Sequence, residues 1–336
     1  MASSESLEAV ASTPRKPRIE YIDLAKGFCI CLVVVNHLAG RLHYDMPMSQ
    51  YLTLFRMPLY YFLSGCFFKV YDGFGGFLKR KVNKLVIPFA FFYLLNSCLL
   101  PRLLFDCFGI SWARLEYSEF LTGFLRPVFP GMPIWFLLAL FGINIVFYLI
   151  HITAQRTRYS LAILVGSAVV LACVGAYITV DVSIYLRAIC RNLLFFVAGY
   201  LAYRKTDVLR PNRFDDYLWL QIIASFALVW FGYNYLPYWL HYYLCGLAGL
   251  YGVVMLAKMI GKLPYFSNIG RYSIMLLVTH MVLIRTAEDL LATFKLTPSL
   301  RFVLILIPVM ASYHFLIPFM KKYMPHVTAQ KDVIKV

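Results

Sequence analysis

Long apolar runs are the feature that most constrains what this chain can fold into. Hydrophobic residues make up 61% of the 336-residue sequence and charged residues only 14%, where an ordinary soluble protein has about 25% charged residues. The apolar residues are gathered in runs without a polar face, unlike the surface helices of a soluble domain. In lipid the backbone must satisfy its own hydrogen bonds, so the runs predict membrane-spanning helices.

The runs predict an all-α fold, a polytopic integral membrane helix bundle of about ten transmembrane helices. The polar stretch 1–17 is expected to be a disordered cytoplasmic tail, 18–322 the single transmembrane domain, and 323–336 a cytoplasmic C-terminal tail. With boundaries good to a few residues, the expected spans are 22–40, 52–70, 85–104, 133–151, 160–180, 185–203, 217–235, 239–257, 272–290 and 302–320.

Lys and Arg are distributed unevenly between the two sides of these spans. If the N-terminus is cytoplasmic, the inner segments carry twenty-one of these residues and the outer loops carry six. Membrane proteins keep positive charge on the cytoplasmic side, so both termini are predicted to be cytoplasmic in a multi-pass protein of the cytoplasmic (inner) membrane. The same rule accounts for the formal net charge of +16, and no nucleic-acid partner is expected.

Two polar side chains, Lys26 and His37, fall inside the first span. On a helix this separation places them about 20° apart around the axis and about 16 Å apart along it. A charge inside a membrane helix marks a functional candidate, and an imidazole can take a proton from a hydroxyl near neutral pH. The alternatives are a Lys26 that snorkels to the headgroups and a His37 that is a hydrogen-bonded packing residue.

No metal site is expected. No second His or carboxylate lies three or four residues from His37, and the other histidines are scattered. The eight cysteines lack metal-ligand spacing and mostly lie inside apolar runs, so they are expected to be packing residues without a disulfide framework.

Two further segments carry unusual charge. Arg56 lies in the outer half of the second span, two residues before Pro58. A buried Arg binds an anion or pairs with an acid, and the second role would be purely structural. A basic cluster then enters the third span from the cytoplasm; it suits the phosphates of a nucleotide-like ligand, although positive-inside charge alone also explains it. The cluster consists of Lys79, Arg80, Lys81 and Lys84.

Five segments resemble, in order, the motifs of the acyltransferase family 3 membrane proteins. The opening signature of that family is a basic residue followed, after ten residues, by a histidine, as at Lys26 and His37. The likeness extends over nearly the whole chain, and the order of the five segments makes it specific. They are Arg18–Gly27 with Asn36-His37, Phe55–Gly65, Phe77–Pro88, Ile134–Leu137, and Asn268–His280.

The resemblance implies a membrane O-acyltransferase, usually an O-acetyltransferase, that moves an acyl group from cytosolic acyl-CoA to a hydroxyl of a cell-envelope glycan or lipid-linked sugar. His37, Lys26 and Arg56 are then the expected catalytic residues, with His37 as general base or transient acyl carrier and Arg56 on the acceptor or the oxyanion. The donor is expected to be acetyl-CoA. Its phosphates are expected to contact Lys26, Lys79, Arg80, Lys81 and Lys84.

Further substrate contacts are expected at Arg56, Trp135, Arg187, Arg191 and His280. Arg187 and Arg191 lie one helical turn apart at the outer start of a span, and a salt bridge or phospholipid contact would equally explain them. The chain departs from the family pattern where Lys replaces a common Arg, which leaves charge binding expected but removes the bidentate fork. These positions are Lys26, Lys81 and Lys84.

Two other functions stay open. A transporter of glycan or lipid would show paired broken helices in matching halves, and no such repeat is evident. An acyltransferase acting on a non-sugar acceptor, such as an amino acid or a small alcohol, is excluded by nothing in the sequence. Membrane lipids and a saccharide acceptor are the expected partners, and the sequence does not define the oligomeric state.

Overall fold

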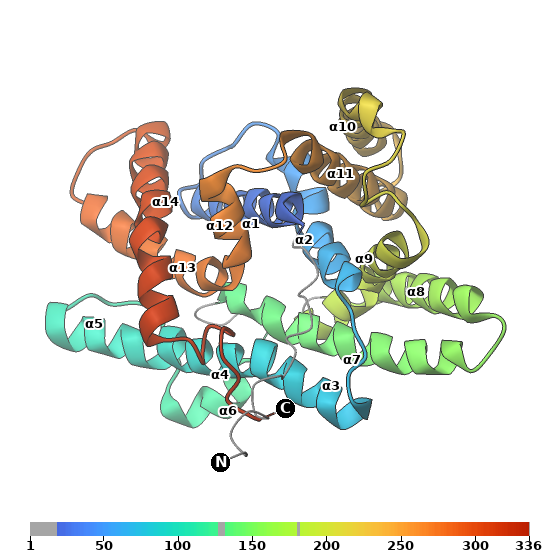
Figure 1. Cartoon of the computed structure of the whole chain (residues 1–336). Coiled ribbons are helices and arrows are strands. Elements are labelled where there is room, and N and C mark those ends of the chain that lie inside the picture. Colours follow the sequence, from blue (N-terminus) through green and yellow to red (C-terminus); the bar gives the residue numbers. More distant parts are fainter. Residues whose placement is uncertain (1–18, 127–131, 180–181, 336) are drawn as a thin grey trace, which may run out of the picture.

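The computed structural model describes residues 19–126, 132–179 and 182–335, and within them the chain is helical without a strand. The helices pack side by side in one bundle (Figure 1). The all-α fold expected from the apolar runs is therefore confirmed. The expected disordered tail, 1–17, lies outside the described residues.

The chain begins with two helices that contact each other, α1 (Glu20–Arg41) and α2 (Ser49–Cys66). A long helical segment follows, in which α3 (Gly73–Lys81), α4 (Ile87–Leu94) and α5 (Leu100–Phe108) are joined by π-helical turns at Val82–Val86 and Leu95–Leu99. The remaining helices are α6 (Phe120–Gly123), α7 (Trp135–Gln155), α8 (Ser160–Tyr177), α9 (Ile184–Lys205), α10 (Leu218–Tyr235), α11 (Tyr238–Ile260), α12 (Pro264–Arg271), α13 (Ser273–Leu291) and α14 (Pro298–Tyr323).

Seven helices of the described chain are long and apolar enough to cross a membrane. Each of the ten expected spans coincides with a long helix, but α2, α10 and α13 are not among the seven. Helix α2 packs against α1, α9 and α11, and its Arg56 lines a cavity inside the bundle. The count of ten spans and the side of the membrane on which the termini lie stay predictions.

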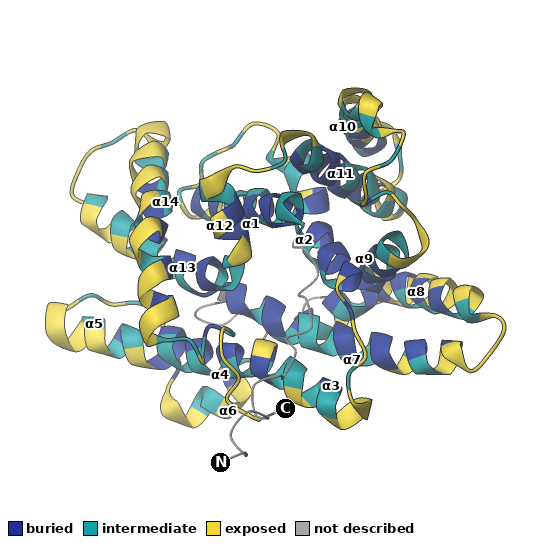
Figure 2. Ribbon diagram, in the orientation of Figure 1, coloured by how far each residue is buried: buried dark blue, intermediate teal, exposed yellow. Residues whose placement is uncertain are grey.

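The exposed surface supports a membrane environment. Residues that face the interior of the bundle are buried, and the outward sides of α8 and α14 are exposed (Figure 2). These exposed sides are apolar; for example, Val170 is 62% exposed and Phe315 75% exposed. A soluble protein rarely leaves large contiguous apolar surfaces in water, so the chain is a multi-pass membrane protein.

Glycines allow two helix pairs to approach very closely. A Cβ on Gly270 of α12 would lie 1.8 Å from the backbone oxygen of Asp23 in α1. A Cβ on Gly199 of α9 would lie 1.9 Å from the backbone oxygen of Phe62 in α2. Only glycine fits at either contact, and the two contacts fix α1 against α12 and α2 against α9.

Buried asparagines on the two π-helical turns tie the long segment to distant parts of the chain. Asn83 donates to the carbonyl of Ile334 at 2.8 Å and accepts the backbone N–H groups of Val333 and Ile334. Asn96 donates to the carbonyl of Val278 in α13 at 2.8 Å. The C-terminal segment, drawn in red in Figure 1, therefore returns from α14 to lie against the first π-helical turn of the long helical segment α3–α5.

Candidate active site

Two adjoining cavities lie inside the bundle. The deep cavity, about 300 Å³, is lined from α1, α2, α7 and the α12–α13 segment. The basic cavity, about 450 Å³, is lined by residues of α1, α2, α7, the long helical segment α3–α5 and the C-terminal tail. The cavities share the side chains of Lys26, Tyr60, Ser64, Leu85 and Leu140.

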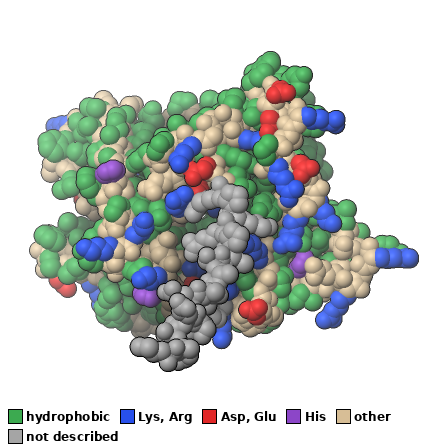
Figure 3. All heavy atoms as spheres, in the orientation of Figure 1, with side chains coloured by type: hydrophobic (Ala, Val, Ile, Leu, Met, Phe, Trp, Pro, Cys, Tyr) green, Lys and Arg blue, Asp and Glu red, His purple; other side chains and the backbone are tan. Residues whose placement is uncertain are grey.

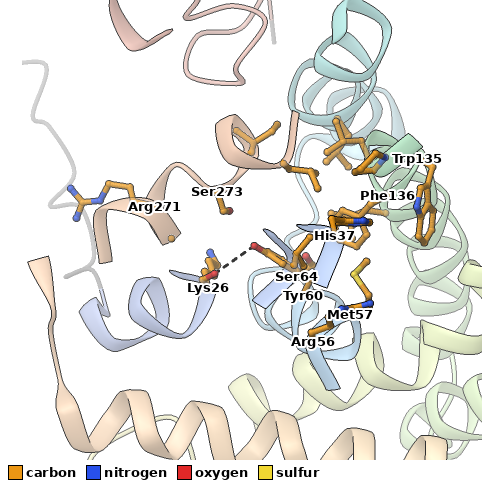
Figure 4. Close-up of a pocket in the computed structure, with 18 residues that line it drawn as sticks. Lys26, His37, Arg56, Met57, Tyr60, Ser64, Trp135, Phe136, Arg271 and Ser273 are labelled. Carbon is orange, nitrogen blue, oxygen red and sulfur yellow. Dashed lines mark hydrogen bonds between the residues drawn. The ribbon is translucent and has the colours of Figure 1, made fainter. Parts of the chain in front are cut away.

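His37 and Lys26 both line the deep cavity. Helix α1 is continuous between them, so the rise of a regular helix separates them by about 16 Å. Lys26 also lines the basic cavity, and its Nζ lies 5.0 Å from the ring centroid of Phe67. Figure 4 shows Lys26 at one side of the site and His37 with Trp135 at the other.

Arg56 enters the deep cavity from α2. Its backbone carbonyl accepts a hydrogen bond from the thiol of Cys29 at 2.7 Å, which connects α2 to α1. Within the described residues its guanidinium has no ion pair with a carboxylate, and no Asp or Glu is among the residues that line this cavity. The structure therefore leaves the Arg56 charge available to a ligand.

Three of the four residues in the basic cluster line the basic cavity: Arg80, Lys81 and Lys84. The guanidinium of Arg80 lies 4.3 Å from the ring centroid of Tyr71, and its buried Nε has no hydrogen-bond partner in the part of the chain that the structure describes. Lys79 is exposed and lines neither cavity. Its contact with a ligand therefore stays a prediction that the geometry does not support.

The five expected substrate contacts are separated in space. Trp135 lines the deep cavity, as Arg56 does, whereas His280 is fully buried and lines neither cavity. Arg187 and Arg191 also lie off both cavities, on α9. The guanidinium of Arg191 packs 4.1 Å from the ring centroid of Tyr242. Direct substrate contact by these last three side chains remains a prediction.

Several cavity residues escaped the sequence reasoning. Tyr60 and Ser64 belong to both cavities, and Ser273 faces the deep cavity from α13. The hydroxyl of Tyr60 donates to the carbonyl of Lys26 at 3.5 Å, the dashed contact in Figure 4. The sequence does contain a pattern that indicates these residues. Met57, Tyr60 and Ser64 follow one another at three- and four-residue spacing, which places them on one face of a helix.

Arg271, the third cation at the deep cavity after Lys26 and Arg56, is already paired. Its Nε lies 3.7 Å from Oδ2 of the buried Asp23, and its Nη2 lies 4.0 Å from Glu20. These contacts hold α12 beside the start of α1, next to the close approach at Gly270. Arg271 therefore acts as a structural cation, unlike Arg56.

The arrangement combines one imidazole, one available guanidinium and apolar walls in the deep cavity with several cations in the basic cavity. Figure 3 shows further Lys and Arg side chains distributed over the face in view, with hydrophobic side chains along its flanks. Such a site can bind a phosphorylated molecule at the basic cavity. It can also remove a proton from a hydroxyl group at His37.

Comparison with protein families gives one match. The acyltransferase domain model of acyltransferase family 3 matches residues 19–313. No curated protein and no solved structure matches the sequence significantly. The matched range contains both cavities except for the C-terminal tail. A match over most of the chain, on a helical membrane bundle, shows that this protein belongs to acyltransferase family 3.

Proposed function

We propose that the protein is a membrane O-acyltransferase, in the first instance an O-acetyltransferase, that uses cytosolic acetyl-CoA. The acceptor is a hydroxyl of a cell-envelope glycan or of a lipid-linked saccharide. One observation supports this above the others: Lys26 lines both cavities, so the basic cavity adjoins the cavity that His37 lines. A donor with a charged head and a long thin arm matches that shape.

The head of the donor fits the basic cavity. Acetyl-CoA carries its phosphates on the nucleotide, and Arg80, Lys81 and Lys84 line this cavity. Within the described residues the buried Nε of Arg80 has no hydrogen-bond partner, and a phosphate oxygen would satisfy it. From Lys26 to His37 the distance along α1 is about 16 Å, which an extended pantetheine arm can span. The thioester would then lie in the deep cavity.

In this proposal His37 carries out the proton transfer of the reaction. As general base, its imidazole takes the proton of the acceptor hydroxyl while the hydroxyl oxygen attacks the thioester carbonyl carbon. The C–S bond breaks, and the thiolate of CoA leaves with the proton from His37. Arg56, without a carboxylate partner in the described chain, stabilises the charge on the carbonyl oxygen. In the alternative two-step route, a nitrogen of His37 carries the acyl group between donor and acceptor.

The test is transfer of label from radiolabelled acetyl-CoA to envelope fractions by the purified protein in liposomes. Label in saccharide that is released by mild base supports an O-acetyl ester on a glycan. Label in a small non-sugar molecule overturns the glycan acceptor and leaves the transferase. Saccharide movement across the vesicle without label overturns the transferase in favour of a transporter.

A further inference from the structure

The side chain of His280 is fully buried, and its two ring nitrogens differ in their hydrogen bonding. It lies on α13 with no exposed surface. Its Nδ1 is 2.8 Å from the carbonyl oxygen of Leu276, and a carbonyl can only accept, so Nδ1 carries the proton. Its Nε2 has no hydrogen-bond partner among the described residues. A buried hydrogen-bond acceptor that receives no hydrogen bond is uncommon and calls for a specific explanation.

The group that faces this histidine is His37. The two ring centroids lie 5.3 Å apart, with the planes inclined by 39°. His37 lines the deep cavity and His280 does not, so His280 approaches His37 from outside the substrate space. Catalytic hydrogen bonds are often long before the substrates bind and tighten in the reactive complex.

We propose that His280 is a positioning residue for His37, through a hydrogen bond that His37 donates to Nε2 of His280. This rests on the proposed role of His37 as the base. Because Nδ1 of His280 is occupied by Leu276, Nε2 can only accept. The ring nitrogen of His37 that faces His280 must then carry the proton. The other nitrogen of His37 presents its lone pair to the deep cavity, which is the form a general base requires.

The fold holds His280 in place for this task. Asn96 donates to the carbonyl of Val278 at 2.8 Å, two residues before His280 on α13. The hydroxyl of Thr279 bonds to the carbonyl of Met275 and contacts the hydroxyl of Tyr313. These contacts fix the rotation of α13 relative to the neighbouring helices. The ring of His280 is further fixed by its own bond to Leu276.

A neutral partner suits this location. Carboxylates orient histidines at many catalytic sites, but no Asp or Glu is among the residues that line the deep cavity. An uncompensated carboxylate inside a membrane bundle is costly. A neutral imidazole supplies the same acceptor without a charge, and it remains hydrogen-bonded to His37 after His37 has taken the proton of the acceptor.

The test compares two amide substitutions of His280 whose side chains differ in length. His280→Gln can place its carbonyl oxygen near the position of Nε2 and keep the acceptor. His280→Asn reaches only the position of Nδ1, so it can keep the bond to Leu276 but removes the acceptor. We expect His280→Asn to lower kcat about 10- to 100-fold with unchanged KM for acetyl-CoA and acceptor, and His280→Gln to retain most of kcat. Equal kcat values for the two amides overturn the proposal.

The matched control is His151→Asn. His151 is also buried, and its Nδ1 is also without a hydrogen-bond partner, but it lies among Phe147 and Tyr200, away from both cavities. We expect wild-type kcat from this variant. A loss of kcat as large as that of His280→Asn would mean that any buried histidine supports activity through packing, which overturns a positioning role.

A second readout does not depend on turnover. Diethyl pyrocarbonate acylates the unprotonated nitrogen of histidine, and mass spectrometry of the peptide that contains His37 gives the rate. We expect wild type and His280→Gln to react at similar rates and His280→Asn several-fold more slowly. Identical rates overturn the proposal. If the rates differ as expected but the wild type transfers no acetyl group, the positioning stands and the proposed function fails.

Discussion

The ammonium Nζ of Lys84 lies 2.9 Å from Oδ1 of Asp332 and 2.8 Å from the carbonyl oxygen of Ala329. The C-terminal tail therefore contacts one of the cations that line the basic cavity, and Asp332 itself lines that cavity. The side chains are 44% and 36% exposed, so the pair contributes at most about 1 kcal/mol. A phosphate could displace this carboxylate from Lys84 at little cost.

Asp332→Asn should lower the apparent KM for acetyl-CoA by up to about 5-fold, because Lys84 no longer has a competing negative charge. Initial rates at varied acetyl-CoA measure the effect. The control is Asp207→Asn, which removes an exposed carboxylate partner of Arg210 away from the basic cavity and should leave KM unchanged. A higher KM in Asp332→Asn would show that the tail helps to bind the donor.

His37→Ala should lower acyl transfer by about 100- to 10,000-fold, the range expected when a general base is removed. The protein should remain in the membrane, because the imidazole lines a cavity and is not part of the packed core. The control is His314→Ala on the exposed side of α14. Product formation is compared at equal protein in liposomes. Near-normal transfer by His37→Ala would remove this residue from the mechanism.

Lys26→Ala and Arg80→Ala should raise the apparent KM for acetyl-CoA by roughly 10-fold or more, because each removes a charged hydrogen-bond donor to phosphate. Lys26→Arg should retain more activity than Lys26→Ala, since the positive charge persists. Lys79→Ala is the matched control, being exposed and outside both cavities. If KM for the acceptor rises instead of KM for acetyl-CoA, the donor site has been misplaced.

Acetyl-CoA should support transfer only from the side of the membrane that carries the termini, and the acceptor should be modified from the opposite side. The depth of His37, about 16 Å from Lys26 along α1, motivates this arrangement. Sealed vesicles of known orientation, with each substrate confined to one side, provide the measurement. A requirement for both substrates on the side of the termini would exclude transfer across the membrane, although the acyltransferase would stand.

Gly199→Ala should destabilise the bundle by about 1–3 kcal/mol, because the new Cβ would lie 1.9 Å from a backbone oxygen of α2. Thermal unfolding in detergent should shift down by several degrees. The control is Gly166→Ala on α8, where a Cβ would meet nothing within 4 Å. An unchanged unfolding temperature for Gly199→Ala would show that the contact between α2 and α9 is looser than described.

The sequence alone was sufficient where the relevant physics is local. Helical membrane spans follow from apolar runs, since a backbone in lipid must pair within its own segment. The shared orientation of Lys26 and His37 follows from helix periodicity over eleven residues, and the two side chains do line one cavity. The ordered motifs also identified the family, which the match over 19–313 confirmed.

The tertiary structure alone decided which distant segments meet. Nothing in the basic cluster distinguishes Lys79 from Lys84 by sequence. The π-helical turn and the packing of the long helical segment α3–α5 place Lys84 on the basic cavity and leave Lys79 off it. The sequence did not relate His280 to His37, and the packing of α13 against α1 places the two rings 5.3 Å apart. Periodicity relates residues within one helix, but the rotation of each helix about its axis depends on contacts such as Gly270 with Asp23, which join residues far apart in the chain.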